Sequence, residues 1–496
     1  MTDRPNILLI VLDQLRADCL FGALSGDVAM PRLRDFASQA TRFQNHYSVT
    51  SPCGPSRVSL LTARYAMNHR SVRNGTPVRA DIPNLGTVLR SAGYDPELFG
   101  YTDFAADPRG LAEDDPRLFT YEGLAPGFSE TVQMRLESDD NAWAMFLKQK
   151  GYASVTYPEV YHASGPELED PTVYSAQDSD TAYLADRTIE ELSQRAPGWA
   201  ALVTFLRPHP PLVAPEPYNR MYDAGKVATP CAAPEPEEFL DLLLARNPIR
   251  QMAPGVTDLE KDALTARRLR AIYFGLITEV DHHIGRILDW LRDSGQYDDT
   301  LIVITADHGE MLGDFGLWGK NTYHDAAFHV PLLIRAPGGG EGAVVDHHTE
   351  SVDVTPTILD YAGIGPVAGM DGRSLRPFVS GEVPANWKTH SFSELDFGDP
   401  IEPTDIQKKH KLGPREANLS VLRQGSERLV YFAKGFSPLL FDHATTGEGV
   451  NRSRLQQDSE RLANLSQNLL SHRLCFADGT FAHTLITSEG PRTVPP

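Results

Sequence analysis

The chain has 496 residues, of which 41% are hydrophobic and 23% are charged, and this composition is typical of a globular protein with a large core. Its formal charge of −20 argues against a surface that binds nucleic acid or anionic membranes, because either would need an excess of Lys and Arg. Any anionic substrate must therefore be met by positive charge that is local to its site.

The first apolar run of the chain, Ile7–Leu12, does not have the setting of a targeting signal. It is short, follows no cluster of basic residues and ends at Asp13 without a small-residue cleavage site, which argues against a signal peptide and a membrane span. The four cysteines lack metal-type spacing and are too few to staple a secreted chain of this size: Cys19, Cys53, Cys231 and Cys475. We therefore expect a cytoplasmic protein that contacts neither membranes nor nucleic acid.

A series of short apolar runs, rich in Val, Ile and Leu, predicts the buried strands of a parallel sheet. The runs are Asn6–Leu12, Glu97–Tyr101, Ala201–Leu206, Leu301–Thr305 and Pro331–Arg335. A helix is predicted over Thr265–Ser294, where apolar residues recur at helical spacing on one stripe. Strands that alternate with helices indicate an α/β fold whose sheet is covered on both faces.

The pattern changes near residue 385. Shorter strand-like runs follow there, and after them a polar helical stretch: Ala417–Arg423, Arg428–Ala433, Leu440–Asp442 and Arg452–Ser471. This indicates a large catalytic domain over residues 1–385 and a small α+β domain over residues 386–496, with a short antiparallel sheet, a helix and a loose tail.

Polar, chemically capable side chains follow four of the predicted strands. In chain order these are Asp13 and Gln14, Tyr101 and Thr102, Arg207 and His209, and Asp307 and His308. Since ligands in open α/β sheets bind beyond the carboxyl ends of the strands, we expect the four strand ends to form one site. Segments 104–180 and 210–262 lack clean periodicity, and we expect them to cover the rim of this site and to contribute oligomer contacts.

The sharpest motif is the C-x-P-x-R sequence from Cys53 to Arg57, which is followed by apolar residues at helical spacing. It predicts that Cys53 lies in the turn that enters a helix, where free backbone N–H groups favour negative charge. A buried free cysteine at a helix start is the plain alternative. The motif resembles that of the sulfatase family of the alkaline phosphatase superfamily, which implies an alkaline-phosphatase-like α/β sandwich with a large, mostly parallel sheet.

The resemblance also implies covalent chemistry at position 53. In that family the cysteine is oxidised to formylglycine by a formylglycine-generating enzyme, and the hydrate of the aldehyde supplies the attacking oxygen. In this chain the role falls on Cys53, and Arg57, four residues further along the predicted helix, would support the hydrate and the adjacent oxyanions. Beside a divalent cation such an oxygen is a far better nucleophile at neutral pH than a Ser or Thr hydroxyl alone.

Two of the strand ends supply a predicted metal site: Asp13, Gln14, Asp307 and His308. Two carboxylates, an amide oxygen and an imidazole suit a hard or borderline cation better than a structural zinc, and the imidazole favours Mn²⁺ over Ca²⁺. Ordinary turn residues after strands are the alternative. Sulfatases often carry Asp in place of Gln14 and Asn in place of His308, so this chain resembles the subgroup that contains phosphonate monoester hydrolases and choline sulfatases.

Further residues are assigned by the same resemblance. His209 and Lys320 match positions for substrate contact and general acid catalysis, and both residue types suit the charge that builds on the departing oxygen. Asn74 and Tyr101 match substrate contacts of the phosphonate monoester hydrolases. For each of these side chains a turn or solvated role is the alternative.

The segment Gly93–Asp103 departs from typical arylsulfatases, which have a Lys and a His where this chain has Tyr101 and Asp103. The phosphonate monoester hydrolases share the tyrosine but usually carry Thr in place of Asp103. A substrate site that has lost two cations and gained a carboxylate should prefer esters with one negative charge over phosphate monoesters, which carry nearly two.

The sequence therefore predicts a formylglycine- and metal-dependent hydrolase of singly charged esters, with sulfate monoesters such as aryl sulfates as the leading substrates. Phosphonate monoester and phosphodiester hydrolysis in the same site is the close alternative. Choline sulfate would need an aromatic cage, which the sequence does not locate. A non-catalytic anion-binding relative stays open, as does a phosphatase or phosphomutase with a Ser or Thr nucleophile. The long rim segments favour a homo-oligomer, either a dimer or a tetramer.

Overall fold

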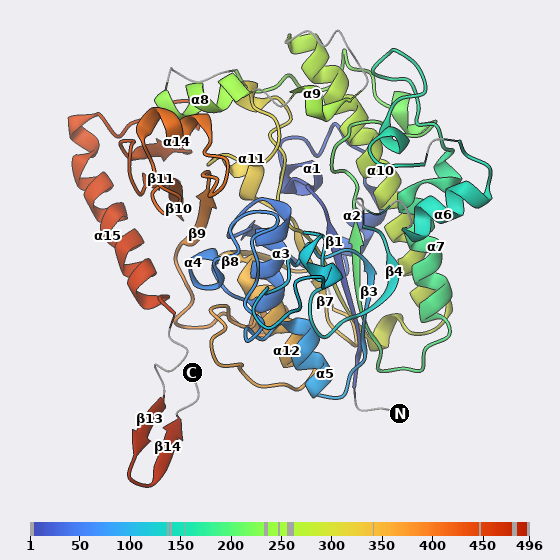
Figure 1. Ribbon diagram of the computed structural model, residues 1–496, viewed down its shortest axis with the longest axis horizontal. Helices are drawn as coiled ribbons and strands as arrows, with labels where there is room; N and C mark the ends of the chain where they lie inside the picture. The colour runs from blue at the N-terminus through green and yellow to red at the C-terminus, as the bar shows by residue number, and fades with distance from the viewer. Residues whose placement is uncertain are drawn as a thin grey trace.

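The computed structural model describes residues 4–135, 138, 141–153, 155–232, 237–246, 249–254, 262–340, 342–445, 448–478 and 484–493. Within these residues, helices enclose a large central sheet, and a smaller sheet lies beside it near the C-terminus (Figure 1). This arrangement confirms the predicted fold class. Across the described part of the chain, no helix is long and apolar enough to cross a lipid bilayer.

The central sheet has eight strands in the order β4-β3-β5-β1-β6-β7-β2-β8. β1 lies in the middle and pairs in parallel with β5 and β6, and β3 extends the parallel arrangement beyond β5. The four strands expected to carry the site therefore end at one edge of the sheet. The bounds are Asn6–Leu12 (β1), Thr41–Tyr47 (β2), Pro96–Gly100 (β3), Ser129–Gln133 (β4), Ala200–Phe205 (β5), Thr300–Ala306 (β6), Leu332–Arg335 (β7) and Val344–Glu350 (β8).

The strand β7 runs antiparallel to both β6 and β2, so the prediction of a parallel strand at Pro331–Arg335 is wrong in direction. The connection from β6 to β7, residues 307–331, contains one short α-helix, α11 (Asp325–Phe328), whereas the crossover between parallel strands usually includes a full α-helix packed on the sheet. The strands β2, β4 and β8 lie at or next to the edges of the sheet, and their mixed sequences do not predict strands.

Helices cover both faces of the central sheet (Figure 1). One face is covered by α2 (Pro31–Ala37), α6 (Ala142–Gln149), α7 (Asp180–Leu192) and α10 (Ala263–Asp293). The other is covered by α3 (Cys53–Thr62), α5 (Leu85–Ser91), α12 (Val354–Tyr361) and α13 (Arg376–Val379). Side chains of β1 alternate between the two cores, with Leu8, Ile10 and Leu12 in the first and Ile7, Leu9 and Val11 in the second. Burial on both faces explains why β1 is apolar throughout.

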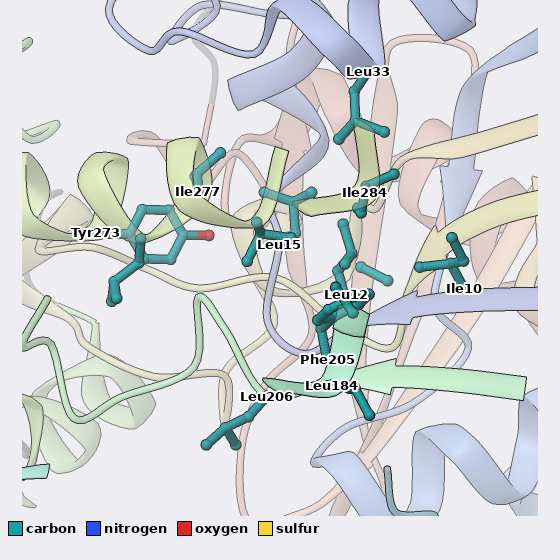
Figure 2. Close-up of a cluster of buried hydrophobic side chains, with 14 of the residues drawn as sticks. Ile10, Leu12, Leu15, Leu33, Leu184, Phe205, Leu206, Tyr273, Ile277 and Ile284 are labelled. Carbon is teal, nitrogen blue, oxygen red and sulfur yellow. The ribbon is translucent and has the colours of Figure 1, made fainter. Parts of the chain in front are cut away.

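The longest helix, α10, agrees with the helix predicted over Thr265–Ser294. Figure 2 shows its Tyr273, Ile277 and Ile284 side chains in the cluster of buried side chains that also holds Leu12 and Leu15. The Tyr273 hydroxyl donates a hydrogen bond to the backbone carbonyl of Gln14, with a distance of 2.7 Å. The apolar stripe of α10 thus fixes the position of the loop that follows β1.

The packing of α10 predicts a stability difference between two substitutions on the same helix. The Ile284 side chain is fully buried in this core, whereas Leu264, in the first turn, is 50% exposed. We expect Ile284→Ala to lower the free energy of unfolding by about 2–4 kcal/mol, because it leaves a cavity, and Leu264→Ala to change it by less than about 0.5 kcal/mol. Urea unfolding followed by circular dichroism measures both; equal shifts would show that α10 is not held by its buried stripe.

Five short helices lie outside these two layers: α1 (Ala17–Phe21), α4 (Ala66–His69), α8 (Glu238–Arg246), α9 (Ile249–Met252) and α14 (Asp405–His410). The second sheet is antiparallel, in the order β12-β11-β10-β9. Its strands are Ser391–Asp396 (β9), Asn418–Gln424 (β10), Glu427–Phe432 (β11) and Leu439–Asp442 (β12). The helix α15 (Ser459–Cys475) packs against this sheet through Leu465 and Leu469.

The small sheet also touches the loop that precedes Cys53, because the Glu394 N–H of β9 donates to the Val49 carbonyl at 2.9 Å. At the end of the chain, β13 (Thr484–Thr487) and β14 (Gly490–Thr493) form a hairpin that projects away from the body (Figure 1). The expectation of a loose tail is therefore wrong for these residues, which pair with each other. The domain boundary near residue 385 stays a prediction.

Candidate active site

The four parallel strands β1, β3, β5 and β6 bring their carboxyl ends together, as expected for an open α/β sheet. At the centre of this edge lie Asp13, after β1, and Asp307 and His308, after β6. Cys53, the first residue of α3, lies in the same group. The ligand-capable atoms of Asp13, Cys53, Asp307 and His308 all lie within 4.8 Å of one another, and all four residues are buried.

The Cys53 thiol lies directly against the predicted metal ligands. Its Sγ is 3.1 Å from His308 Nε2 and 3.8 Å from Asp13 Oδ1. Burial raises the pKa of the Cys53 thiol, and the carboxylate of Asp13 raises it further, so the unmodified side chain is a neutral thiol here. An unmodified Cys53 would therefore be a poor nucleophile, because the thiolate is the reactive form of cysteine.

Arg57 holds the outer oxygens of the carboxylates. Its guanidinium donates to Asp13 Oδ2, to Asp307 Oδ2 at 2.9 Å and to Asp103 Oδ2 at 2.6 Å. The Tyr101 hydroxyl also donates to Asp13 Oδ2, at 2.7 Å, and the tyrosine ring lies 4.2 Å from the guanidinium. With Oδ2 taken, Asp13 Oδ1 faces Cys53 and His308.

The carboxylate of Asp307 is fixed by the backbone as well. Its Oδ1 accepts hydrogen bonds from the N–H groups of Gln14, at 3.1 Å, and of His308, at 2.8 Å. Gln14 has a φ of 75°, in the left-handed region that non-glycine residues seldom adopt, so the turn after β1 is held by its surroundings. In this turn the Gln14 N–H donates to Asp307, and the Gln14 carbonyl accepts from Tyr273 of α10.

The Gln14 amide is oriented by Glu310. The Gln14 Nε2 donates to Glu310 Oε2, and the other oxygen of Glu310 accepts from the N–H groups of Leu312, at 3.0 Å, and Gly319, at 2.6 Å. Gln14 Oε1 therefore faces the opposite way and accepts from Lys320 Nζ at 2.6 Å. Glu310 is fully buried. It positions a predicted metal ligand and the loop of Lys320 at once.

Lys320 and His209 form one hydrogen-bonded pair at the mouth of the site. Lys320 Nζ is 2.9 Å from His209 Nε2, and His209 Nδ1 donates to the Pro210 carbonyl. The proton of a neutral imidazole is thereby placed on Nδ1, and its Nε2 accepts from the ammonium. Burial, and then the charge of Lys320, lower the pKa of His209 to about 4. Burial would by itself lower the pKa of Lys320. The negative charges around it outweigh this effect and raise its pKa above the ordinary value.

The donor set fits a divalent cation. Burial, and then the charge of Lys320, lower the pKa of His308 well below its ordinary value, so its imidazole is neutral. The His308 Nδ1 lies 3.1 Å from the Gly309 carbonyl, which leaves Nε2 to act as a ligand atom. Burial, and then the carboxylate of Asp13, raise the pKa of Asp307 to about 7. The mutual repulsion of these two carboxylates is what a bound cation relieves.

The remaining predicted residues surround this centre. Asn74 Oδ1 accepts from the Gly54 N–H at 2.9 Å, at the start of α3. The side chains of Tyr101 and Asp103 accept hydrogen bonds from Arg57, and both residues are buried. All the site residues predicted from the sequence are thus brought together. The roles assigned to them by resemblance stay predictions.

Two positioning residues were not found by sequence reasoning. Glu310 stands two residues after His308 in the run Asp307–Glu310, and an acidic residue so close to a predicted metal ligand was the available signal. Tyr273 carries no such signal, since its hydroxyl reaches Gln14 across a sequence separation of 259 residues.

A cleft leads from solvent to Gln14, His209 and Lys320. It encloses about 1470 Å³, including space that is open to solvent. Its walls are polar and apolar in about equal measure. The larger apolar side chains come from the rim segments and from the loop that precedes Lys320: Tyr157, Leu243, Met252, Pro254, Leu317 and Trp318. The prediction that segments 104–180 and 210–262 cover the rim is confirmed for Tyr157, Leu243, Met252 and Pro254.

Known proteins share both the sequence and the architecture of this chain. The family model described as Sulfatase matches residues 5–364. The multifunctional alkaline phosphatase superfamily protein PehA of Trinickia caryophylli is 34% identical and is covered, like this chain, over 99% of its length. The phosphonate monoester hydrolase SpPMH from Silicibacter pomeroyi is 48% identical, with a TM-score of 0.96 over 99% of each chain.

A second solved structure, the phosphonate monoester hydrolase of Agrobacterium radiobacter, is 36% identical, with a TM-score of 0.92 over 99% of this chain and 100% of that one. The family model and the whole-length relatives agree with the site geometry, in which a C-x-P-x-R cysteine lies against a metal-type donor set. The chain is therefore a hydrolase that belongs to the sulfatase family of the alkaline phosphatase superfamily.

Proposed function

We propose that this protein is a formylglycine- and metal-dependent hydrolase of singly charged esters, with phosphonate monoesters and phosphodiesters foremost and sulfate monoesters cleaved in the same site. One observation carries the proposal: the side chain of Cys53 lies within hydrogen-bonding distance of His308 and beside Asp13, inside a buried donor set. The order of substrates reverses the one that the sequence favoured, because two phosphonate monoester hydrolases match the chain over almost its whole length.

Asp13, Gln14, Asp307 and His308 are the residues that would hold the metal ion, with Mn²⁺ preferred and Ca²⁺ as the alternative. A bound divalent ion would supply positive charge that favours an oxyanion on the modified residue 53 and on the ester. Arg57 and Tyr101 hold the outer oxygen of Asp13 and leave its inner oxygen directed at residue 53. The chain thus orients the metal ligands before substrate binds.

Lys320 is the group that carries the proton to the leaving oxygen. His209 is neutral, with its hydrogen on Nδ1, and accepts from the Lys320 ammonium through Nε2. His209 therefore orients Lys320, whose Nζ lies at the base of the cleft through which the leaving group departs. A cation at this place stabilises the charge that grows on the departing oxygen and then neutralises it by proton transfer.

The assignment of Lys320 predicts an effect that depends on the leaving group. We expect Lys320→Ala to lower kcat/KM for alkyl esters by about 10²-fold or more, because an alkoxide needs a proton, and by much less for nitrophenyl esters, whose leaving group is stable as an anion. Steady-state rates for the two ester types measure the difference. Lys226→Ala, at an 86% exposed side chain, is the matched control and should leave both rates unchanged. Equal losses for both esters would remove Lys320 from the role of the acid.

The cleft supports an uncharged leaving group. The residues that line it in the described part of the chain include neither Asp nor Glu, and Lys320 stands at its base. A quaternary ammonium in this cleft would meet Lys320 but none of the Asp or Glu side chains that could bind it, which argues against choline sulfate as the substrate.

Oxidation of Cys53 is tested by mass spectrometry of the tryptic peptide that covers residues 43–57. In protein produced with a formylglycine-generating enzyme, the mass should correspond to an aldehyde in place of the thiol-bearing carbon. A thiol throughout, together with retained binding of anions, would favour the non-catalytic alternative. Rates for nitrophenyl esters of sulfate, phenylphosphonate and a phosphodiester, measured side by side, then rank the substrate classes.

The partners that follow from this proposal are the formylglycine-generating enzyme and further copies of the same chain. A dimer or tetramer stays a prediction, and light scattering of the purified protein tests it; a monomer at micromolar concentration would contradict it.

A further inference from the structure

The guanidinium of Arg57 meets a carboxylate that does not belong to the predicted metal site. Its Nη1 donates to Asp103 Oδ2 at 2.6 Å, while its Nη2 serves Asp13 and Asp307. The side chains of Arg57 and Asp103 are 2% and 5% exposed, so the pair is shielded from solvent. A charge in such a place acts on its neighbours more strongly than a surface charge does.

Asp103 also lies beside the start of α3, where the reactive residue stands. A Cβ placed on Gly54, the neighbour of Cys53, would be only 3.2 Å from the backbone oxygen of Asp103 and 3.1 Å from Asn74 Oδ1. The loop after β3 thus packs closely against the first turn of α3, beside residue 53. Asp103 holds a left-handed backbone conformation there, with a φ of 54°.

The charges of the inner site come close to cancelling. The described residues of this centre include the carboxylates of Asp13, Asp103, Asp307 and Glu310. The opposing charges are those of Arg57, Lys320 and one divalent ion. His209 adds no charge, because its Nδ1 donates to the Pro210 carbonyl and its Nε2 accepts from Lys320, and an imidazole that binds a metal ion is neutral as well. With Asp103 ionised the site is near neutrality, and without it the site would carry about one positive charge. An incoming dianion gains less from a neutral pocket than from a cationic one.

We infer that Asp103 is a specificity-determining residue that disfavours doubly charged phosphate monoesters relative to singly charged esters. The inference rests on the proposed function and names the substrate feature, one negative charge, that this site selects. Asp103 neutralises part of the Arg57 charge that would otherwise attract the second negative charge of a phosphate monoester. The side chain acts on the bound ester through its charge.

The test compares two nitrophenyl substrates that share the leaving group and differ in charge, the phosphate monoester and a phosphodiester. The quantity of interest is the ratio of kcat/KM for the monoester to kcat/KM for the diester at pH 8. We expect Asp103→Asn to raise this ratio by about tenfold or more, since it removes a unit charge in a site of low effective permittivity. Asp103→Thr, a second neutral variant, should raise it as well, and Asp103→Glu should keep it near the value of the unaltered protein.

The pH dependence of the ratio gives an internal control. A phosphate monoester loses its second negative charge below about pH 6, whereas the diester keeps one charge throughout. The difference in ratio between Asp103→Asn and the unaltered protein should therefore shrink as the pH falls from 8 to 5. Asp81→Asn, which removes an acidic side chain that is 64% exposed, is the control for net charge and should not move the ratio.

Two results would overturn the inference. The ratio could stay the same in both neutral variants, whether or not the hydrolysis of both substrates slows in parallel, or Asp103→Glu could behave like the neutral variants. The parallel loss would mean that Asp103 merely supports Arg57. Failure of the proposed function looks different, because the unaltered protein would then hydrolyse none of the esters or keep an unmodified Cys53.

Discussion

Cys53→Ala should abolish turnover, with kcat/KM falling by about 10⁴-fold or more for every ester that the protein hydrolyses. Two serine hydroxyls near it in the chain are committed elsewhere: Ser56 Oγ donates to the Asp307 carbonyl and Ser51 Oγ to the Lys320 carbonyl, at 3.0 Å. Neither can take the place of the oxygen on residue 53. The loss should appear in kcat, because the anion-binding groups around residue 53 remain.

The matched control is Cys475→Ala, which removes an exposed cysteine at the end of α15. It should retain full activity. A metal analysis of Cys53→Ala should still find the ion, since Asp13, Asp307 and His308 are untouched. Substantial hydrolysis by Cys53→Ala would mean that another group attacks the ester, and the account of residue 53 would then be wrong.

Asp307→Asn should lower activity by about 10³-fold and reduce the bound metal to well below one ion per chain. The substitution keeps the acceptor for the N–H groups of Gln14 and His308, so the turn geometry is retained, but it removes the charge that binds the cation. Elemental analysis and steady-state rates, measured with and without added Mn²⁺, check the result. Asp298→Asn, at a side chain that is 78% exposed just before β6, is the control.

The unfolding temperature of the metal-free Asp307→Asn variant should depend on pH differently from that of the metal-free parent. The pKa of Asp307 is raised in the folded chain to about 7, so its contribution to stability is present at acid pH and is lost as the pH rises toward 7. Metal-free Asp307→Asn lacks this loss and should unfold at a higher temperature than the metal-free parent at pH 8. Added Mn²⁺ should stabilise the parent alone. A variant that unfolds earlier at every pH would show that Asp307 is mainly structural.

The sequence by itself determined the features that depend on local pattern. Continuous apolar runs identify β1, β5 and β6, because a strand that is buried on both faces of a sheet has apolar residues at successive positions. The stripe of α10 and the C-x-P-x-R motif are equally local. Asp13, Gln14, Asp307 and His308 could be proposed as neighbours because the carboxyl ends of parallel strands meet at one edge of a sheet.

What the tertiary structure alone decided are contacts between side chains far apart in the chain. The sequence did not indicate that Glu310 orients the Gln14 amide or that Tyr273 anchors the Gln14 carbonyl, since these contacts depend on how the loops after β1 and β6 fold over α10. The direction of β7 and the pairing of the terminal hairpin likewise depend on the path of the connecting loops and on neighbouring strands. The neutral state of His209 required knowledge of its burial beside Lys320, because a pKa is set by the surroundings of a group and its residue type supplies only the starting value.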